Sequence, residues 1–371
     1  MTSIIYFLLF LSLFLMVLFA CHYFVYFSII RFFEVSGMLK KVLLISIIFL
    51  SLSFILSSIL ARWKDCFLIR AFYFFSGFWL GLLLYLILAS VAVWIIFFAG
   101  KKFGFNLNIS LFANIFFIFA FLISIYGVYN AFDLKVKNID VSIPNLPSEW
   151  ENKKIVHISD LHLGLIHRDL FMKNLVEKIN LINPEIVAIT GDFFDSVDGD
   201  FDFLPKWISK IHSNQGIYFV TGNHETYLGL EKTFDVLEKT KMKILKDEVV
   251  DLDGLKLIGI DYPNRNENKD IIETLNSLQE DFLNQPNILL CHSPAFVDKI
   301  KDLGINFQLS GHTHSGQIFP INFITQFIYK GYSYGLHKIG DYSIYTTSGA
   351  GTWGPPMRVG THSEIVVITF K

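Results

Sequence analysis

Cysteine is scarce in this chain of 371 residues, which contains three: Cys21, Cys66 and Cys291. Three thiols cannot build a framework of disulfides, and their positions in or beside apolar runs do not indicate a redox compartment. The shortage also argues against a structural zinc site or an iron–sulfur cluster, because cysteine thiolates usually hold both.

Charged residues are few as well, at 17% of the sequence against 53% hydrophobic residues. The mean hydropathy of +0.47 is too apolar for one soluble protein. Residues 1–132 carry eight basic and two acidic residues, a net charge of +6, whereas the remaining 23 basic and 31 acidic residues give −8. The acidic second half lacks the basic surface that neutralises nucleic-acid phosphates, so no nucleic-acid partner is expected.

Long apolar runs are what the first half does contain. Four are long enough to cross a bilayer, which takes roughly 20 residues: Ile4–Ile30, Val42–Leu60, Ala71–Ala99 and Ile109–Phe132. They show no polar stripe, which disfavours buried helices of a soluble protein. The first run lacks the basic start of a signal peptide, because nothing basic precedes Arg31. We therefore predict a multi-pass membrane region at 1–132, with a cell-membrane location.

The charges between the runs bear on orientation. An even number of spans places both ends of the chain on the same side of the bilayer. The first and third connections hold Arg31, Lys40, Lys41, Lys101 and Lys102, and the second holds Arg62, Lys64 and Arg70. By the positive-inside rule this excess favours an extracytoplasmic C-terminal domain, although Lys135 and Lys137 favour the opposite.

The second half alternates apolar strands with helical patterns. Residues 133–152 read as an edge strand and linker with Pro144 and Pro147. From residue 153 to 371 we expect an α/β domain in which a later, strand-rich part forms a second sheet on the first, with helices outside. The predicted fold is a four-layer α-β-β-α sandwich preceded by an all-α region of four transmembrane helices. Predicted strands are 155–159, 186–190, 217–221, 248–252, 255–260, 288–291, 307–310, 343–347 and 365–370, and predicted helices 169–182, 201–212 and 230–240.

Five of these strands end in residues that bind metals. The strand ends carry Asp160 and His162, Asp192, Asn223 and His224, His292, and His312 and His314. A single histidine at a strand end is more often structural than a ligand, but five strand ends with the same feature are not coincidence. Neighbouring glycines let the backbone turn sharply, so that adjacent side chains can face inward.

This mixture of carboxylate, amide and imidazole suits Mn²⁺, Fe, Zn²⁺ or Mg²⁺. Seven ligands exceed the usual complement of one ion but fit two, particularly if a carboxylate bridges them. Two divalent ions roughly 3.5–4 Å apart act as a clamp for displacement at phosphorus. The charge of such a site is net positive, which predicts an anionic substrate.

In order, the motifs Asp-x-His, Gly-Asp, Gly-Asn-His-Glu, a lone His and Gly-His-x-His resemble those of the calcineurin-like metallophosphoesterase superfamily across residues 153–314. The resemblance implies that Asp160, His162 and His314 hold one metal, that Asp192 bridges, and that Asn223, His292 and His312 hold the other. It also implies that His224 acts as general acid or stabilises the pentacoordinate state, with Glu225 orienting its imidazole.

The segments 310–317 and 347–364 resemble more narrowly a bacterial membrane-associated branch, which includes relatives of UDP-2,3-diacylglucosamine hydrolases. In the tail, Arg358 either reaches a substrate phosphate or braces a loop. Trp353 and the aromatic segment Phe323–Tyr334 either touch a lipid or form an apolar cluster beneath a long loop, and the cluster is slightly favoured.

The sequence thus predicts a membrane-anchored phosphoesterase that uses two metal ions and a metal-activated water to hydrolyse a phosphodiester or pyrophosphate. The expected partners are the lipid bilayer and a phosphorylated small molecule or lipid-linked substrate. Two alternatives stay open: a UDP-2,3-diacylglucosamine-type pyrophosphohydrolase, and a non-enzymatic metal-binding membrane receptor or scaffold with a vestigial site. A channel is disfavoured because no paired charges lie within the spans.

Overall fold

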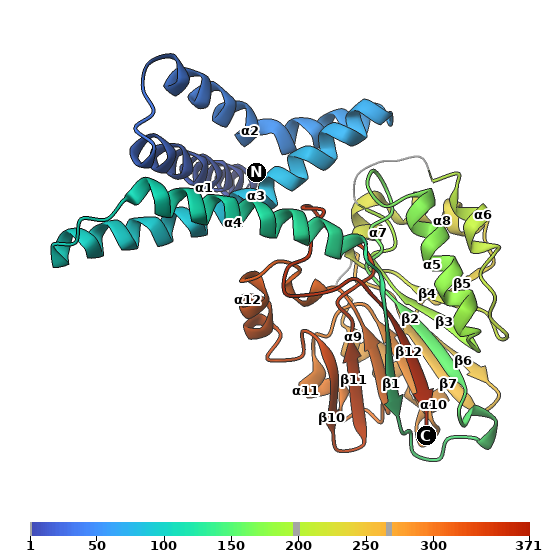
Figure 1. Ribbon diagram of the computed structural model, residues 1–371. Helices are drawn as coiled ribbons and strands as arrows, with labels where there is room; N and C mark the ends of the chain where they lie inside the picture. The colour runs from blue at the N-terminus through green and yellow to red at the C-terminus, as the bar shows by residue number, and fades with distance from the viewer. Residues whose placement is uncertain (1, 196–200, 265–268) are drawn as a thin grey trace. The chain divides into compact units, whose positions relative to one another are not determined.

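The computed structural model describes residues 2–195, 201–264 and 269–371 (Figure 1). The chain forms two compact units. One comprises the residues up to Val128 together with Gly354–Met357, and the other comprises Tyr129–Trp353 and Arg358–Lys371. The division near residue 129 lies close to the boundary at 132 that the end of the last apolar run suggests.

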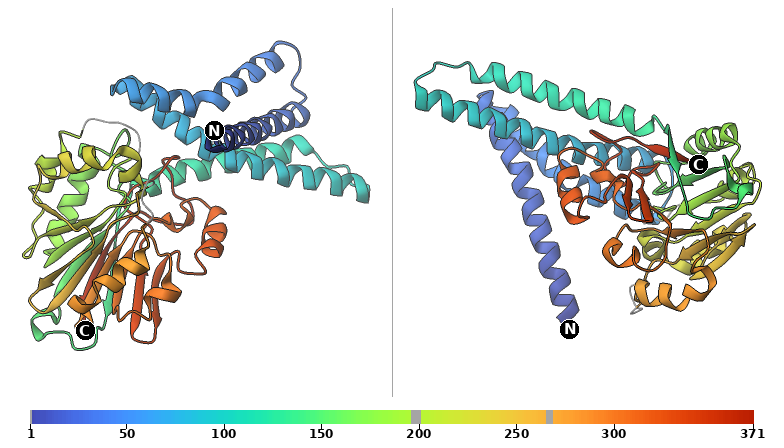
Figure 2. Two further views of the ribbon diagram at one scale, coloured as in Figure 1. Left: turned by 180° about the vertical axis from the view of Figure 1, so that it is seen from behind. Right: turned by 90° about the horizontal axis from the view of Figure 1, so that it is seen from below.

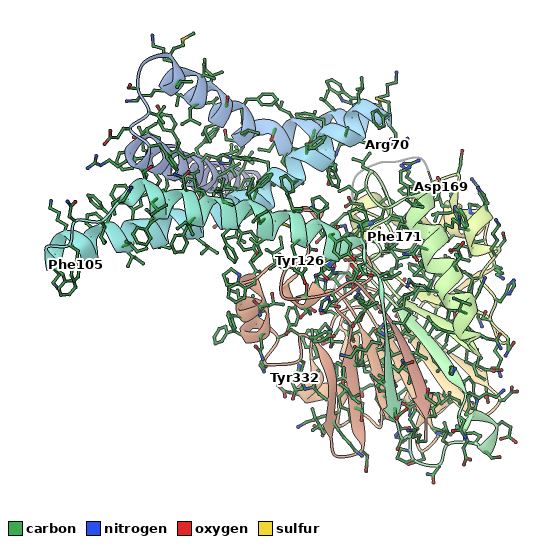
Figure 3. All side chains as sticks on the ribbon, viewed as in Figure 1. Arg70, Phe105, Tyr126, Asp169, Phe171 and Tyr332 are labelled. Carbon is green, nitrogen blue, oxygen red and sulfur yellow. The ribbon has the colours of Figure 1, made fainter. Side chains whose placement is uncertain are left out.

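The first unit consists of long apolar helices. They are α1 (Thr2–Phe32), α2 (Gly37–Trp63), α3 (Phe67–Phe103) and α4 (Ile109–Phe132). All four are long and apolar enough to cross a membrane. Large apolar side chains are exposed, among them Tyr126 of α4 at 50% and Phe105, in the connection between α3 and α4, at 65% (Figure 3). Such a surface suits lipid rather than water.

Some polar side chains inside this unit hydrogen-bond to one another. The Nε1–H of Trp79 donates to His22 Nε2 at 3.0 Å, and the hydroxyls of Ser57 and Ser76 lie 2.8 Å apart. His22 therefore has structural partners, which favours a structural role for this lone histidine of the first span.

The second unit is built on two six-stranded mixed sheets. The first has the order β1-β12-β2-β3-β4-β5, in which β2 to β5 are parallel and β12 pairs antiparallel with β2. Its strands are β1 (Lys135–Val141), β2 (Lys154–Ile158), β3 (Ile186–Thr190), β4 (Ile217–Val220), β5 (Met242–Ile244) and β12 (Glu364–Phe370). Strand β1 lies at the edge of this sheet, as predicted for a strand followed by Pro144 and Pro147.

The second sheet has the order β10-β11-β9-β8-β7-β6, with the four central strands parallel. Its strands are β6 (Glu248–Leu252), β7 (Leu255–Ile260), β8 (Asn287–Cys291), β9 (Phe307–Ser310), β10 (Gly335–Ile339) and β11 (Tyr342–Thr346). The two antiparallel pairs, β6 with β7 and β10 with β11, form its edges.

Three apolar cores separate four layers, which confirms the predicted α-β-β-α sandwich (Figure 2). Helices α5 (Asp169–Ile182), α6 (Leu204–Ile208) and α8 (Leu230–Leu237) cover the first sheet. The two sheets pack on each other through Ile155, Leu290 and Tyr345, among others. Helices α9 (Ile271–Ser277), α10 (Gln279–Phe282) and α11 (Val297–Ile300) cover the second sheet.

Some elements differ from the sequence predictions. The helix expected at 201–212 is regular only over Leu204–Ile208, where Pro205 occupies its first turn. The short strands β5 and β10 were not predicted. The apolar cluster favoured for Phe323–Tyr334 is wrong, because helix α12 (Ile321–Ile328) has no buried residue.

Trp150, in the short 3₁₀ helix Ser148–Trp150, is the anchor of the linker. It is 1% exposed, packs edge-on against Phe370, and its Nε1–H donates to the Leu252 carbonyl at 2.8 Å. We expect Trp150→Ala to lower the free energy of unfolding by about 3–5 kcal/mol, because it leaves a cavity and an unpaired carbonyl. Thermal unfolding of the full chain in detergent measures the effect. The matched control, Leu181→Ala at a position 86% exposed, should leave the midpoint unchanged. Equal midpoints for both variants would contradict the anchoring role.

Candidate metal centre

The predicted ligands meet at one edge of the sandwich. Strands β2, β3 and β4 of the first sheet and β8 and β9 of the second end at this edge, and the loops that follow them carry the ligands. The carboxyl ends of parallel strands are where open α/β sheets bind ligands. The predicted ligands Asp160, His162, Asp192, Asn223, His292 and His314 are all at most 8% exposed.

The backbone turns at the ligands themselves. Asp160, His162, Asp192, His312 and His314 have φ values of 53°, 47°, 47°, 71° and 49°. Residues other than glycine rarely adopt this left-handed conformation, and it concentrates at functional sites. Tight turns at these positions direct the side chains toward a common centre.

Two of the neighbouring glycines serve close approach rather than backbone freedom. A Cβ at Gly222 would lie 2.3 Å from Asp192 Oδ1, and a Cβ at Gly311 would lie 2.3 Å from Asp160 Oδ2. Any larger residue would displace these carboxylates. The role of these glycines is therefore to let a loop from one strand pack directly on a ligand from another.

One cluster of potential metal ligands contains Asp160, His162 and His314. The Nε2 atoms of the two imidazoles lie 3.0 Å apart, and His314 Nε2 lies 3.6 Å from Asp160 Oδ1. The Asp160 carboxylate also accepts a hydrogen bond from the His312 amide at 3.0 Å, which ties the β2 loop to the β9 loop.

A second cluster contains Asp192, His292 and His312. His292 Nε2 lies 3.2 Å from Asp192 Oδ2, 3.1 Å from Asn223 Oδ1 and 3.2 Å from His312 Nδ1. Asp192 also groups with His162 and His224. The same carboxylate therefore faces ligands of both clusters, which is the position that a bridging ligand takes.

Burial keeps most of these imidazoles neutral, the form that binds metals. It lowers the pKa of His312 to about 4 and holds the pKa values of His162 and His314 well below the usual range. Burial likewise raises the pKa of Asp160 to about 7, because a buried carboxylate charge lacks solvation. The cluster of Asp160, His162 and His314 therefore lacks a positive charge that would stabilise the Asp160 carboxylate, and a bound cation would supply it.

Asp192 and His292 are shifted the other way. Burial opposes the charged form of each, but their mutual attraction outweighs it, so the pKa of Asp192 falls and that of His292 rises to about 9. The site attracts positive charge at this point.

The donor set fits two divalent cations. Two imidazole nitrogens lie 3.0 Å apart, and imidazole nitrogens lie 3.2 and 3.6 Å from carboxylate oxygens. Groups this close need a shared cation or proton between them. His292 Nδ1 lies 2.7 Å from the Thr190 carbonyl, and by donating to it the neutral ring leaves the Nε2 lone pair free for a metal. Two carboxylates, one amide oxygen and four imidazoles suit Mn²⁺, Fe, Zn²⁺ or Mg²⁺.

His224 lies beside both clusters, at the start of helix α7 (Asn223–Leu228). Its ring centroid is 4.5 Å from that of His162, and its amide donates to Asp192 Oδ1 at 2.8 Å. Its Nδ1 lies 3.7 Å from Asp195 Oδ1. Burial lowers the pKa of His224 although Asp192 raises it in part.

Glu225 has a role that differs from the expected one. Its carboxylate accepts hydrogen bonds from the amides of Asp192, Phe193 and Phe194 at 2.9–3.1 Å and from the Gly222 amide at 2.6 Å. Glu225 thus fixes the loop that carries Asp192, and the acid beside the His224 imidazole is Asp195.

Asp195 is the residue that sequence reasoning missed. It stands in the same loop as Asp192, three positions later in Gly191-Asp-Phe-Phe-Asp195. That spacing was the available signal, since a second acid in a ligand loop can face the same site.

Arg358 is fully buried, with 0% exposure. Its Nη2 donates to the carbonyls of Ser348 and Gly351 at 2.6 and 2.7 Å, and its Nη1 donates to the His314 carbonyl at 3.3 Å. Burial lowers its pKa to about 10. These contacts favour the loop-bracing alternative, in which Arg358 positions His314, while phosphate binding by Arg358 stays a prediction.

Comparison with known proteins supports the same chemistry. A family profile described as calcineurin-like phosphoesterase matches residues 153–316. An uncharacterized metallophosphoesterase of Campylobacter jejuni is 37% identical over 245 residues, 64% of this chain and 63% of that protein. A transmembrane protein with metallophosphoesterase domain from Danio rerio is 30% identical over 271 residues, 67% of this chain and 60% of that protein. The chain thus spans less than two thirds of the length of these two relatives.

An uncharacterized metallophosphoesterase of Aquifex aeolicus is 30% identical over 261 residues, 68% of this chain and 97% of that protein. The shared region therefore includes nearly all of that protein. With the two clusters of ligands at the strand ends, this match shows that the chain belongs to the calcineurin-like metallophosphoesterase family.

Proposed function

We propose that this protein is a membrane-anchored phosphoesterase that hydrolyses a phosphodiester or pyrophosphate bond. The observation that carries the proposal is the position of Asp192, which faces ligands of both clusters while its carboxylate accepts the amide hydrogen of His224. Two divalent ions held there, by the residues the sequence predicts, would supply Lewis acidity and a water of lowered pKa.

The remaining groups of the site bind and position. The loops that carry the predicted ligands hydrogen-bond across the two sheets, so little rearrangement is needed when metal ions bind. These ligands are Asp160, His162 and His314 on one side and Asn223, His292 and His312 on the other. His224 is placed to donate a proton or a hydrogen bond to the leaving-group oxygen, and Asp195 near its Nδ1 orients the ring. This division of roles suits in-line displacement at phosphorus.

The vestigial receptor is less well supported. A receptor needs the metal ligands at most, whereas the Asp195–His224 pair binds no predicted ion and is suited to proton transfer. A pyrophosphohydrolase that acts on a UDP-2,3-diacylglucosamine-type substrate stays within the proposed reaction class.

Anchoring follows from the four apolar helices and from the short connection behind them. Helix α4 ends at Phe132 and strand β1 begins at Lys135, so two residues join the last span to the sheet. The Danio rerio relative is named as a transmembrane protein, which agrees with this arrangement.

The proposed reaction can be tested at His224 and Asp192. His224→Ala and Asp192→Ala should each abolish hydrolysis of bis(p-nitrophenyl) phosphate by the full chain with Mn²⁺, because one removes the acid and the other the bridging ligand. His224→Ala should keep its bound metal and Asp192→Ala should lose part of it. Full activity in either variant would sink the assignment.

The role of Asp195 can be tested in the same assay. Asp195→Asn should lower kcat roughly ten- to a hundredfold and shift the pH profile, with metal content and KM nearly unchanged, because the residue acts through the His224 imidazole. Asp235→Asn, at an exposed position on α8, is the control. Wild-type kcat and pH profile in Asp195→Asn would remove it from the mechanism.

The orientation of the chain in the membrane can be tested separately. The excess of basic residues in the first and third connections supports an extracytoplasmic catalytic domain. An alkaline phosphatase fused to the C-terminus should then be active in a bacterial host, and a green fluorescent protein at the same place should be dark. The opposite pair of signals would place the domain in the cytoplasm.

A further inference from the structure

Helix α12 (Ile321–Ile328) exposes an apolar face that the domain does not cover. Phe323 and Ile324 are each 60% exposed, Phe327 is 84% exposed and Ile328 is 62% exposed. These positions are spaced i, i+1, i+4 and i+5, so they lie on one side of the helix. None of the eight residues of α12 is charged. Such a contiguous apolar face on a domain otherwise rich in charge marks a contact surface.

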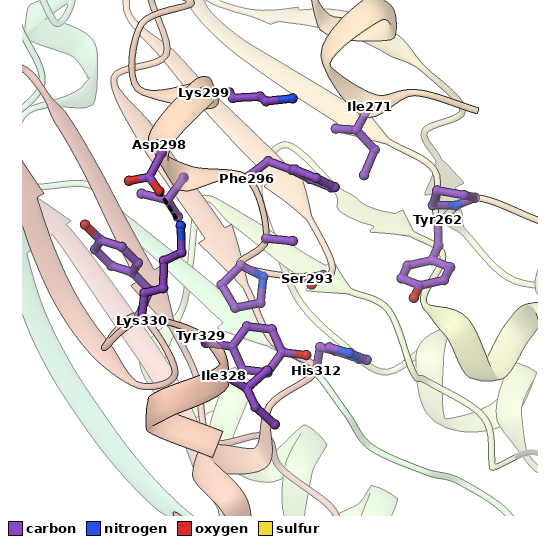
Figure 4. A pocket seen from close by; sticks show the side chains of 15 residues that line it. Tyr262, Ile271, Ser293, Phe296, Asp298, Lys299, His312, Ile328, Tyr329 and Lys330 are labelled. Carbon is purple, nitrogen blue, oxygen red and sulfur yellow. Dashed lines mark hydrogen bonds and ion pairs between the residues drawn. The ribbon is translucent and has the colours of Figure 1, made fainter. Parts of the chain in front are cut away.

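The end of this helix borders a cavity that reaches the metal centre. The cavity has a volume of about 580 Å³, and its lining includes Ile328 and Tyr329 with His312, a predicted metal ligand, beside them (Figure 4). Other lining residues include Tyr262, Phe296 and Val297. The ring of His312 lies 6.0 Å from that of Tyr329 and 6.3 Å from that of Tyr262. The charged residues Asp298, Lys299 and Lys330 also line the cavity, but its lining is mainly apolar and leads from the exposed helix toward His312.

We propose that the apolar face of α12 lies in the interface of the bilayer and that this cavity receives the apolar part of a phosphorylated lipid, whose phosphate then reaches the metal ligands. The first half stands on α12 alone, and the second half rests on the proposed phosphoesterase function. The substrate class is accordingly an amphiphile with a phosphodiester or pyrophosphate group, drawn from the membrane.

The bilayer is the occupant that the chain itself indicates. Two residues join the last apolar helix to β1, so the domain stays within a short tether of any membrane that α4 crosses. Apolar residues on one face with Tyr329 and Lys330 directly after them are typical of a helix at the membrane surface. A soluble protein partner or a second copy of the chain has no comparable observation in its favour and is an outcome of the test.

Fluorescence in nanodiscs tests the position of α12 without any enzyme assay. Phe327→Cys is labelled with an environment-sensitive dye in a full-length chain carrying Cys21→Ser and Cys66→Ser, since the third cysteine, Cys291, is buried. In phosphatidylcholine–phosphatidylglycerol nanodiscs the label should emit at shorter wavelength and be quenched by spin-labelled lipids. The matched control is Leu181→Cys, on an exposed apolar residue of α5, which should show neither effect. Equal quenching at the two positions, or none at Phe327→Cys, would overturn the proposal.

Activity tests the substrate class. In Ile324→Ser/Phe327→Ser, and in Ala295→Trp, which replaces a small residue of the cavity lining with a large one, hydrolysis of dioleoyl-phosphatidylglycerol in vesicles should fall roughly tenfold relative to wild type. Hydrolysis of soluble bis(p-nitrophenyl) phosphate should stay the same in Ile324→Ser/Phe327→Ser, as should both activities in Leu181→Ser. Unchanged vesicle hydrolysis in these variants, or a wild-type enzyme that cleaves only the soluble ester, overturns the lipid substrate and leaves the phosphoesterase standing. If the wild-type enzyme hydrolysed neither the vesicle lipid nor the soluble ester, the proposed function itself would be refuted.

Discussion

The carboxylate of Asp192 is the contact on which the rest of the site depends. It lies 3.2 Å from His292 Nε2, accepts the His224 amide at 2.8 Å, and groups with His162 on its other side. One residue thereby links predicted ligands from both sheets to His224, the proposed general acid. Its own amide is held by Glu225, which also binds the next two amides and that of Gly222. A buried acid that accepts four backbone hydrogen bonds is a rigid support for a ligand loop.

This arrangement explains why the fold uses two sheets. Each of the two predicted metal clusters combines residues that follow β2 or β3 of one sheet with residues that follow β8 or β9 of the other. The apolar core between the sheets fixes their separation. Left-handed backbone turns at five predicted ligands then direct these side chains toward a common centre. Such turns cost of order 1–3 kcal/mol each and persist only where surrounding structure enforces them.

Much of this could be read from the sequence, for physical reasons. Strands β3, β6, β7 and β9 have the predicted bounds, because each is a short apolar or alternating run that a glycine or polar residue ends. The seven predicted ligands could be picked out because each follows such a strand. Strands β5 and β10 were not visible, since three to five residues without a clear pattern carry too little signal.

What the sequence did not reveal depends on contacts between distant segments. Glu225 stands beside His224 in the chain, yet its side chain turns to the Asp192 loop, and Asp195 takes the place beside the imidazole. Apolar composition usually means burial, so the exposed face of α12 was assigned to a covered cluster. A membrane as second solvent reverses that rule, which is why the same residues support a lipid substrate.

The central claim is that five strand ends hold two metal ions through one shared carboxylate. The most direct measurement is the number of divalent ions bound by the purified full-length protein, counted by mass spectrometry of the dissolved sample after equilibration with Mn²⁺. The account predicts two ions per chain, within roughly 3.5–4 Å of each other, whose magnetic coupling electron paramagnetic resonance detects. A single ion per chain, or two ions without coupling, would contradict it.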